Sequence, residues 1–354
     1  MRTFMNRALL LCLAVTMICG FSAAQSLDLP QASQFAKSTQ QIGVTEVTVT
    51  YHRPLINGRK VWGGLVPYGQ VWRTGADENT IIEFSTDVMV EGKPLAKGVY
   101  GLHTIPTETE WTIIFSKNYT SWGSFTYDQA EDALRATVKP QTSDLRETMA
   151  IEFDNVQPAS AQLTIRWEKI SVPVKIEANV TEATANYLKN QLKSWTFRAN
   201  WSAYNDAANY LLNNKLNLDD ALKFADQSIR IEERLDNLLV KSRIQEAQGY
   251  LKDSAVTKKR ALEVGTGVQL NNYGRSLQRN GQQDAAFEVF RQNIKIRPED
   301  WTSHTQLARI AVAANDFNTA VKEMKLALDV TPPQAKASVQ ALINRLEKKE
   351  DINK

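Results

Sequence analysis

The spacing of apolar residues changes once along this chain of 354 residues, and that change limits the folds it can adopt. Between about Val44 and Ile176, apolar and polar residues alternate in short runs, as they do in half-buried strands. From about Glu182 onward, apolar residues recur three and four positions apart, as they do on amphipathic helices. The change predicts an α+β multidomain chain, with a β-rich domain over 25–178 followed by an all-α domain over 179–354.

Several short segments of the first domain place their apolar side chains on one face. The clearest are "VTVTY", "WTIIF" and "LTIRWEK", which begin at Val47, Trp111 and Leu163. Gly, Pro, Asp and Asn separate such segments, so the pattern indicates an antiparallel β-sandwich or barrel. Five of the eight tryptophans fall in this domain, and we expect them to fill its core. They are Trp62, Trp72, Trp111, Trp122 and Trp167.

The second domain contains a repeated pattern. A small residue recurs near the start of the second helix of each expected repeat, at intervals of 34, 31 and 34 residues. These small residues are Ala221, Ala255, Ala286 and Ala320. Pro298 and Pro332 stand twelve residues after the last two and are expected to end those helices.

This pattern resembles the tetratricopeptide repeat over roughly 183–335, with four degenerate repeats and a capping helix near 335–349. A solenoid of this kind has a concave face that can hold a segment of a protein partner. An irregular helical bundle is the alternative that the pattern leaves open.

The first 24 residues have the three-part layout of a secretory signal peptide. Arg2 and Arg7 precede an apolar run, and the small residues after it suit cleavage after Ala24. We therefore expect a periplasmic or secreted mature protein with no membrane span. Lipid anchoring through Cys19 is less favoured, because the residues before it match a lipoprotein signal poorly. Since Cys12 also lies in the signal, the mature chain has no cysteine for disulfides, thiolate catalysis or metal binding.

Charge divides unevenly between the two domains. Residues 25–178 carry a formal net charge of −4, and residues 179–354 carry +5. Neither value approaches the basicity of a nucleic-acid-binding domain, so we expect no nucleic-acid partner.

Histidine is scarce in the mature chain, which limits the chemistry that can be predicted. His52 and His103 both lie at strand ends, where Asp77 or Glu78 could join them in a metal site or in the active site of an envelope hydrolase. No spaced metal motif, nucleophile elbow or phosphate-binding loop supports either idea. We therefore assign no metal, no cofactor and no catalytic residue.

A stretch rich in turn residues, "LVPYGQVWRTGADENT" over 65–80, has two interpretations. In the first, its aromatic ring joins the core and its polar groups bond to the backbone of their own loop. In the second, the polar groups line a cleft in which a polar ligand stacks on an aromatic ring. The second interpretation yields a candidate ligand-binding set, which spans this loop and two residues further along the chain. The set is Trp72, Arg73, Thr74, Asp77, Glu78, Asn79, His103 and Trp122.

The same stretch carries a family resemblance. The string that starts "YHRPLINGRKVWGGLVPYGQVWRTGADENT", followed by "WGSFTYD" and "LTIRWEK", resembles the DUF2911 family over about 40–176. That resemblance implies a secreted β-rich bacterial domain, common in Bacteroidetes and sometimes joined to repeat helices. It implies no established activity, so no catalytic residue is carried over.

Three functions are compatible with these observations. The leading hypothesis is an exported, non-enzymatic binding or scaffold protein, whose β-domain takes a small polar ligand, a glycan or an envelope component and whose repeats bind a protein partner. An envelope hydrolase that uses His52 or His103 with Asp77 or Glu78 is the second. The third is an assembly module that joins a partner through exposed strand edges.

Overall fold

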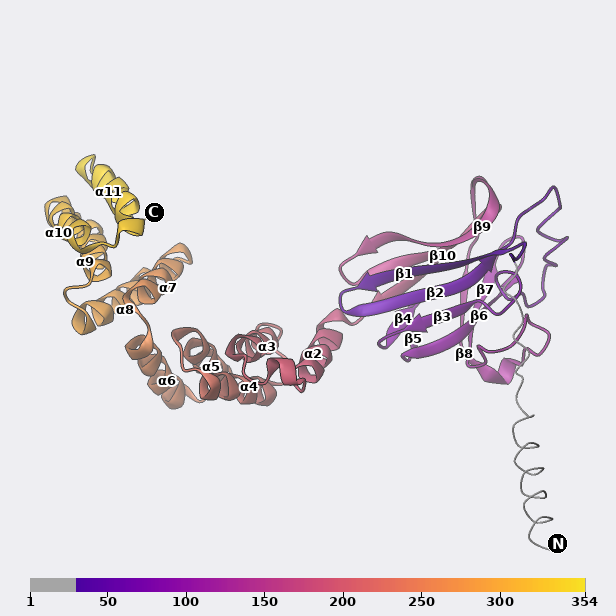
Figure 1. The fold of residues 1–354 in the computed structure, drawn as a ribbon, viewed down its shortest axis with the longest axis horizontal. Coiled ribbons are helices and arrows are strands. Elements are labelled where there is room, and N and C mark those ends of the chain that lie inside the picture. The colour runs from indigo at the N-terminus through magenta and orange to yellow at the C-terminus, as the bar shows by residue number, and fades with distance from the viewer. Residues whose placement is uncertain (1–29, 354) are drawn as a thin grey trace, which may run out of the picture. The chain divides into compact units, whose positions relative to one another are not determined.

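The computed structural model describes residues 30–353. The predicted signal peptide and both cysteines lie outside these residues. The chain divides into two compact units that meet between Val180 and Thr181, and each is described by itself (Figure 1). Every helix among residues 30–353 is too short or too polar to cross a membrane.

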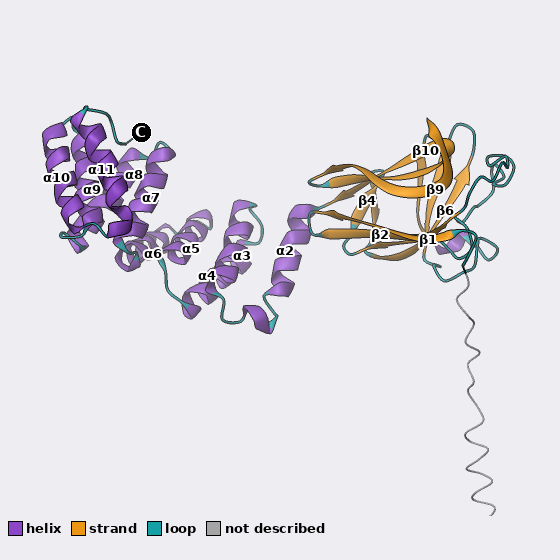
Figure 2. Ribbon diagram, turned by 45° about the horizontal axis from the view of Figure 1, so that its top comes forward, coloured by secondary structure: helices purple, strands orange, loops and turns teal. Residues whose placement is uncertain are grey.

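Ten strands in the part of the first unit that the structure describes form a β-sandwich (Figure 2). They are β1 (Gln34–Ile42), β2 (Thr45–Arg53), β3 (Ile81–Phe84), β4 (Val88–Val90), β5 (Lys93–Leu95), β6 (Gly98–Pro106), β7 (Trp111–Ser116), β8 (Asp132–Val138), β9 (Gln141–Gln157) and β10 (Ser160–Ala178). One sheet has the order β1-β2-β3-β6-β7-β8 and the other β5-β4-β10-β9. All of these strand pairs are antiparallel, which confirms the predicted class.

The inner faces of the two sheets supply the core, as the alternating pattern predicts. Val47 and Val49 of β2 and Leu163 of β10 are fully buried. Four tryptophans meet between the sheets, with ring centroids between 4.9 and 6.5 Å apart. They are Trp62, Trp72, Trp111 and Trp167.

The fifth tryptophan corrects one expectation. Trp122 is 57% exposed, so its assignment to the core is wrong. The reason is its position on the loop between β7 and β8, outside the alternation of any strand. The sequence pattern also missed one strand, β1. Its side chains are mostly exposed, although it pairs with β2 along its whole length.

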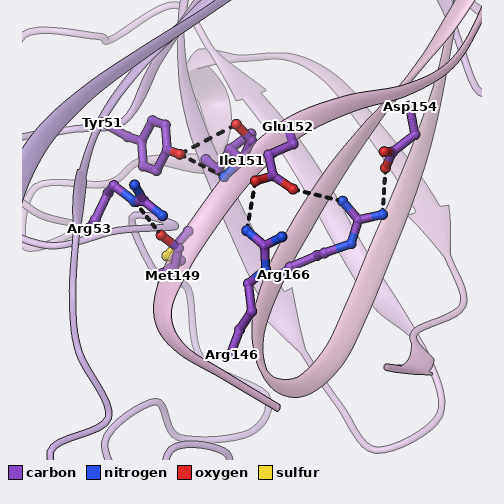
Figure 3. A network of polar contacts seen from close by, with 8 residues as sticks. All are labelled: Tyr51, Arg53, Arg146, Met149, Ile151, Glu152, Asp154 and Arg166. Carbon is purple, nitrogen blue, oxygen red and sulfur yellow. Dashed lines mark hydrogen bonds and ion pairs between the residues drawn. The ribbon is translucent and has the colours of Figure 1, made fainter. Parts of the chain in front are cut away.

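A polar connection ties the two sheets together at one side of the sandwich (Figure 3). The Tyr51 hydroxyl of β2 accepts a hydrogen bond from the backbone N–H of Ile151 in β9 at 2.8 Å. Arg53 Nε donates to the carbonyl of Met149 at 2.7 Å. The chain after β2 then pairs with β9 through a bridge between Leu55 and Thr148. These contacts satisfy backbone groups that the outer strand β9 would otherwise leave unpaired.

The same strand carries an ion-pair network on its outer face (Figure 3). Glu152 accepts from Arg146 at 2.6 Å and from Arg166 of β10 at 3.0 Å. Arg166 also reaches Asp154 at 2.6 Å. Because these side chains remain partly exposed, the network aligns β9 and β10 and adds little stability.

Ten α-helices make up the described part of the second unit. They are α2 (Val180–Gln191), α3 (Trp201–Asn213), α4 (Leu218–Ile231), α5 (Leu235–Ala247), α6 (Leu251–Val264), α7 (Gly267–Arg279), α8 (Gln283–Ile296), α9 (Trp301–Ala313), α10 (Phe317–Val330) and α11 (Pro333–Glu347). From α3 to α10 they form four successive helix pairs, with α2 before them and α11 after them. The predicted helical repeats are confirmed, and α8 and α10 end just before Pro298 and Pro332 as expected.

The repeat register needs one correction. Ala221, Ala286 and Ala320 are fully buried at equivalent points of their helices, but Ala255 is exposed and Ser254 is buried in its place. The Oγ of Ser254 lies 2.9 Å from the Oγ of Ser242, so the hydroxyl is satisfied inside the helix pair. A pattern that looks for small apolar residues selects the neighbouring alanine, because it cannot detect this partner.

We predict that Tyr51→Phe lowers the free energy of unfolding of the β-unit by about 1–3 kcal/mol, because the buried N–H of Ile151 loses its acceptor. Urea unfolding followed by tryptophan fluorescence measures the loss. Tyr119→Phe, a change at a partly exposed tyrosine of the same unit, is the matched control. Equal stabilities for the two variants would contradict the assigned role of the hydroxyl.

Candidate functional site

The loop over 73–80 connects Trp72 with β3, and both of these pair with β6. Trp72 bridges Thr104 of β6 through two backbone hydrogen bonds of 2.8 Å. Further along the chain, β3 pairs with the beginning of β6. The eight residues between these segments must bulge away from the sheet. The backbone N–H of Ala76 meets the carbonyl of His52 at 3.2 Å, which fixes the loop against the end of β2.

Two members of the predicted ligand-binding set face the interior. Trp72 stacks on Trp167 at 5.9 Å and donates from Nε1 to the carbonyl of Gly75 at 3.1 Å. Thr74 is fully buried and donates to Thr104 Oγ1 at 3.1 Å. Its φ of 55° is unusual for a β-branched residue, and such strain persists only where the surroundings hold it in place. These two residues shape the loop and do not face a ligand.

Five other members lie where this loop meets the loop over 117–128, between β7 and β8, whereas Asp77 lies beside His52. The five are Arg73, Glu78, Asn79, His103 and Trp122. Glu78 forms a β-bridge with Trp122. A Cβ at Gly123 would lie 3.6 Å from the guanidinium of Arg73, so Arg73 also reaches the second loop. The structure thus joins two segments more than forty residues apart, around the polar groups of the first and an exposed aromatic ring of the second.

Asn79 and His103 both approach Gly101 of β6. A Cβ at Gly101 would lie 3.4 Å from Asn79 Nδ2, 3.3 Å from His103 Nε2 and only 2.5 Å from the carbonyl of Asn118. Any other residue at Gly101 would push the second loop off the strand. Both side-chain polar atoms of Asn79 are buried without a hydrogen-bond partner among the described residues.

His52 lies with both predicted carboxylates. Its Nε2 is 3.0 Å from Glu78 Oε2, and its Nδ1 is 3.8 Å from Asp77 Oδ2. Nδ1 also faces the carbonyl of Ser33 at 3.0 Å, and Phe35 packs edge-on against the ring at 5.7 Å. Among residues 30–353, no three His, Cys, Asp or Glu side chains are arranged to hold a metal ion.

His103 has a different set of neighbours. It is 3% exposed, and its Nδ1 lies 3.0 Å from the Oγ of Ser124. Burial lowers the pKa of His103 to about 4, although the nearby Asp132 opposes the shift. The ring is therefore neutral near pH 7, and the same burial makes its protonation costly. Nothing in the spacing of His103 and Ser124 along the chain indicates that they touch.

Asp132 is a second polar group that supports the loop over 117–128. Asp132 Oδ2 accepts from the hydroxyl of Tyr127 at 2.7 Å and from Arg135 Nε at 2.5 Å. The ring of Tyr127 packs 5.5 Å from that of His103. Burial raises the pKa of Tyr127, so its hydroxyl stays protonated and continues to donate. The loop is held from both of its ends.

Above this support, the loop presents aromatic rings to solvent. Tyr119, Trp122 and Phe125 are 39%, 57% and 85% exposed. Three aromatic rings on one loop are costly to leave in water, and surfaces of this kind commonly bind a ligand or partner. Arg73 and Glu78 add one charge of each sign beside them.

The helical unit has a separate polar groove of about 370 Å³. Its walls come mainly from the first helices of consecutive pairs, which follow one side of this unit (Figure 1). Asn205 and Asn209 of α3, Arg243 of α5 and Tyr273 of α7 line it. Arg243 donates to Asn209 at 3.3 Å, whereas the buried Oδ1 of Asn205 has no partner among the described residues.

Comparison with known proteins finds a family model that resembles the first unit. Residues 33–176 match the family model described as "Protein of unknown function (DUF2911)", which confirms the resemblance seen in the sequence. The match runs from just before β1 into β10, so it includes both loops of the candidate site. A search of the curated proteins found no match.

Solved structures similar to the helical region include MamA, with 15% identity, 46% of this chain and 92% of that chain covered, and a TM-score of 0.27. YrrB, described as a TPR protein with an unusual peptide-binding site, has 16% identity, coverage of 46% and 84%, and a TM-score of 0.25. The APC/C hetero-tetramer Cut9–Hcn1 has 15% identity, coverage of 48% and 33%, and a TM-score of 0.28. The repeat assignment itself rests on the helix pairs described above.

We predict that stability depends on pH through His103. In the unfolded chain its imidazole takes a proton near pH 6.5, but in the folded chain only near pH 4. Between these values the unfolded state binds more protons, so acidification across this window destabilises the fold by up to about 3 kcal/mol. His103→Asn, which can still bond to Ser124 but does not titrate, should remove this part of the dependence. Parallel stability curves from pH 7 to pH 4 for the two proteins would contradict the prediction.

Proposed function

We propose that this is an exported binding protein, not an enzyme, with one recognition surface in each unit. The groove of the helical unit binds an extended segment of a partner protein. The two loops of the β-unit bind a small polar ligand or glycan of the cell envelope. Export follows from the signal-like first 24 residues and places the mature protein in the periplasm or outside the cell.

The polar lining of the helical groove carries the proposal for a peptide. An extended peptide presents an N–H and a C=O at every residue, and all of them need partners when they leave water. Asn205, Asn209 and Arg243 offer donors and acceptors along the groove, and Tyr273 offers a flat apolar wall. Side-chain amides and guanidinium groups bond well to backbone amides, whereas a groove for an amphipathic helix is lined mainly by apolar residues.

The exposed aromatic loop carries the proposal for a glycan. A sugar ring has a flat apolar face and a rim of hydroxyl groups, so it fits an aromatic ring flanked by polar side chains. Trp122 supplies the ring, and Arg73, which reaches the same loop at Gly123, supplies donors beside it. The strained, braced backbone of the loop at 73–80 holds these groups in position before a ligand arrives.

A hydrolase is the second candidate, because His103 touches Ser124 at 3.0 Å and is neutral near pH 7. A neutral imidazole beside a serine hydroxyl is the arrangement that activates a nucleophile. In this chain the carboxylates Asp77 and Glu78 lie with His52 and not with His103, so the residues of the predicted hydrolase site are divided between two places.

We predict that eight-residue peptides selected by display against the full mature chain depend on Arg243. Arg243→Ala should weaken their binding at least about tenfold, because the groove loses its principal charged donor. Fluorescence anisotropy of labelled peptides measures the change. Arg230→Ala, which removes an exposed arginine bonded to Gln227 of its own helix, is the matched control. Equal effects of the two variants would place the peptides elsewhere.

We predict that Trp122→Ala abolishes binding to any glycan retained on an array of envelope oligosaccharides, with the melting temperature unchanged because the ring is exposed. Trp195→Ala, at a tryptophan of the helical unit that is 79% exposed, should leave glycan binding intact. Retention of glycans by the Trp122 variant would refute the site. Cleavage of a bound glycan, lost on Ser124→Ala, would favour the hydrolase.

A further inference from the structure

Three arginines occupy equivalent positions in successive repeats, and a fourth lies one turn further along the final helix. Arg243 of α5, Arg275 of α7, Arg309 of α9 and Arg345 of α11 follow one another at intervals of 32, 34 and 36 residues. These intervals are close to the repeat length, so the side chains recur on the same side of the helical unit. Arg243 lines the groove described above. The other three continue the line toward the end of the chain.

The C-terminal segment of the chain lies across those three arginines. Arg345 donates to the carbonyl of Asp351 at 2.9 Å, and Arg309 donates to the carbonyl of Ile352. Arg275 donates to the carbonyl of Asn353 at 3.1 Å. Three consecutive backbone carbonyls are therefore each bound by one arginine, which is the way the groove would hold an extended peptide.

Side chains of the segment complete this seat. Ile352 is fully buried in the apolar cluster of the last repeat. Asn353 accepts from Gln278 at 2.9 Å and donates to the carbonyl of Arg309 at 2.9 Å. One apolar anchor with polar contacts on both sides of it is the usual layout of a bound peptide.

The C-terminal segment balances only part of the positive charge of these three arginines. Arg309 is only 7% exposed, and its Nε has no hydrogen-bond partner among the described residues. Burial, together with Arg275 and Arg345, lowers the pKa of Arg309 to about 9, and Asp351 is the acid that opposes the shift. Of the three guanidinium groups only that of Arg309 is buried, and two carboxylates face them, Asp351 and the Glu350 that lies 3.2 Å from Arg345 Nε. The positive charge that remains favours a ligand that brings more negative charge.

We propose that the peptide-binding groove continues from Arg243 along the line of arginines and that the C-terminal segment is its built-in occupant there. An extended acidic segment of the partner, with one apolar residue, displaces it from Arg275, Arg309 and Arg345. This inference rests on the proposed role of the helical unit in binding peptides. Occupation in cis reduces the apparent affinity of a partner in proportion to the fraction of time that the groove is open.

The test uses a labelled, amidated peptide, EEEEDIN, which keeps the Asp-Ile-Asn of the segment and adds acids before it. Its neutral counterpart QQQQNIN controls for charge. Asp351→Lys in the full chain places a fourth cation against the arginines and should release the segment. We expect EEEEDIN to bind this variant at least tenfold more tightly than the native chain, and QQQQNIN to bind neither. Arg309→Gln in the released background should remove the gain, whereas Arg230→Gln should not.

Two further measurements keep the result decisive. Thermal unfolding shows whether the released variant is folded, and a chain ending at Glu350 provides a second route to an open groove. Equal binding of EEEEDIN by the native and both opened chains would overturn the inference and make the segment a permanent structural cap. If Arg243-dependent peptides still bind at that point, the proposed function survives. If they do not, both proposals fail together.

Discussion

Four tryptophan rings packed between the two sheets are the contact on which the β-unit depends. Two of the rings come from strands and two from loops, and each covers apolar area of the others. Trp111 and Trp167 come from β7 and β10, whereas Trp62 and Trp72 precede β3 and lie in irregular segments. Insertion of Trp72 into this cluster fixes the point at which the loop at 73–80 leaves the sheet, and every residue of the candidate site on that loop depends on it.

The stretch over 65–80 therefore has both of the roles that its composition suggests, since it braces the fold and also presents a polar group to solvent. Trp72 and Thr74 turn inward and brace the loop, whereas Glu78 turns outward. The bracing residues Trp72 and Thr74 precede Asp77, whose φ lies in the left-handed region, and the exposed acid Glu78 follows it. A loop held this firmly loses little entropy when it binds, which favours a binding surface over a flexible connection.

The helical unit carries one kind of side chain, arginine, at repeated positions. Guanidinium groups at repeat intervals give a line of donors, and donors need acceptors once they are partly buried. Toward the end of the chain the acceptors are the chain's own carbonyls, from Asp351 to Asn353. At Arg243 the acceptors are asparagine side chains, which are exposed to exchange with a ligand. One line of arginines therefore has a closed end and an open end.

The sequence by itself determined the two classes of structure, their order and most of the helices, because apolar periodicity and proline act over a few residues. It also selected the two loops that meet at the candidate site. Only the tertiary structure decided the pairing of His52 with Glu78 and of His103 with Ser124, since these contacts join segments far apart in the chain. The burial of Ser254 and the strand β1 follow the same rule. Each depends on a partner that a local pattern does not contain, and long-range packing outweighs local preference wherever the two differ.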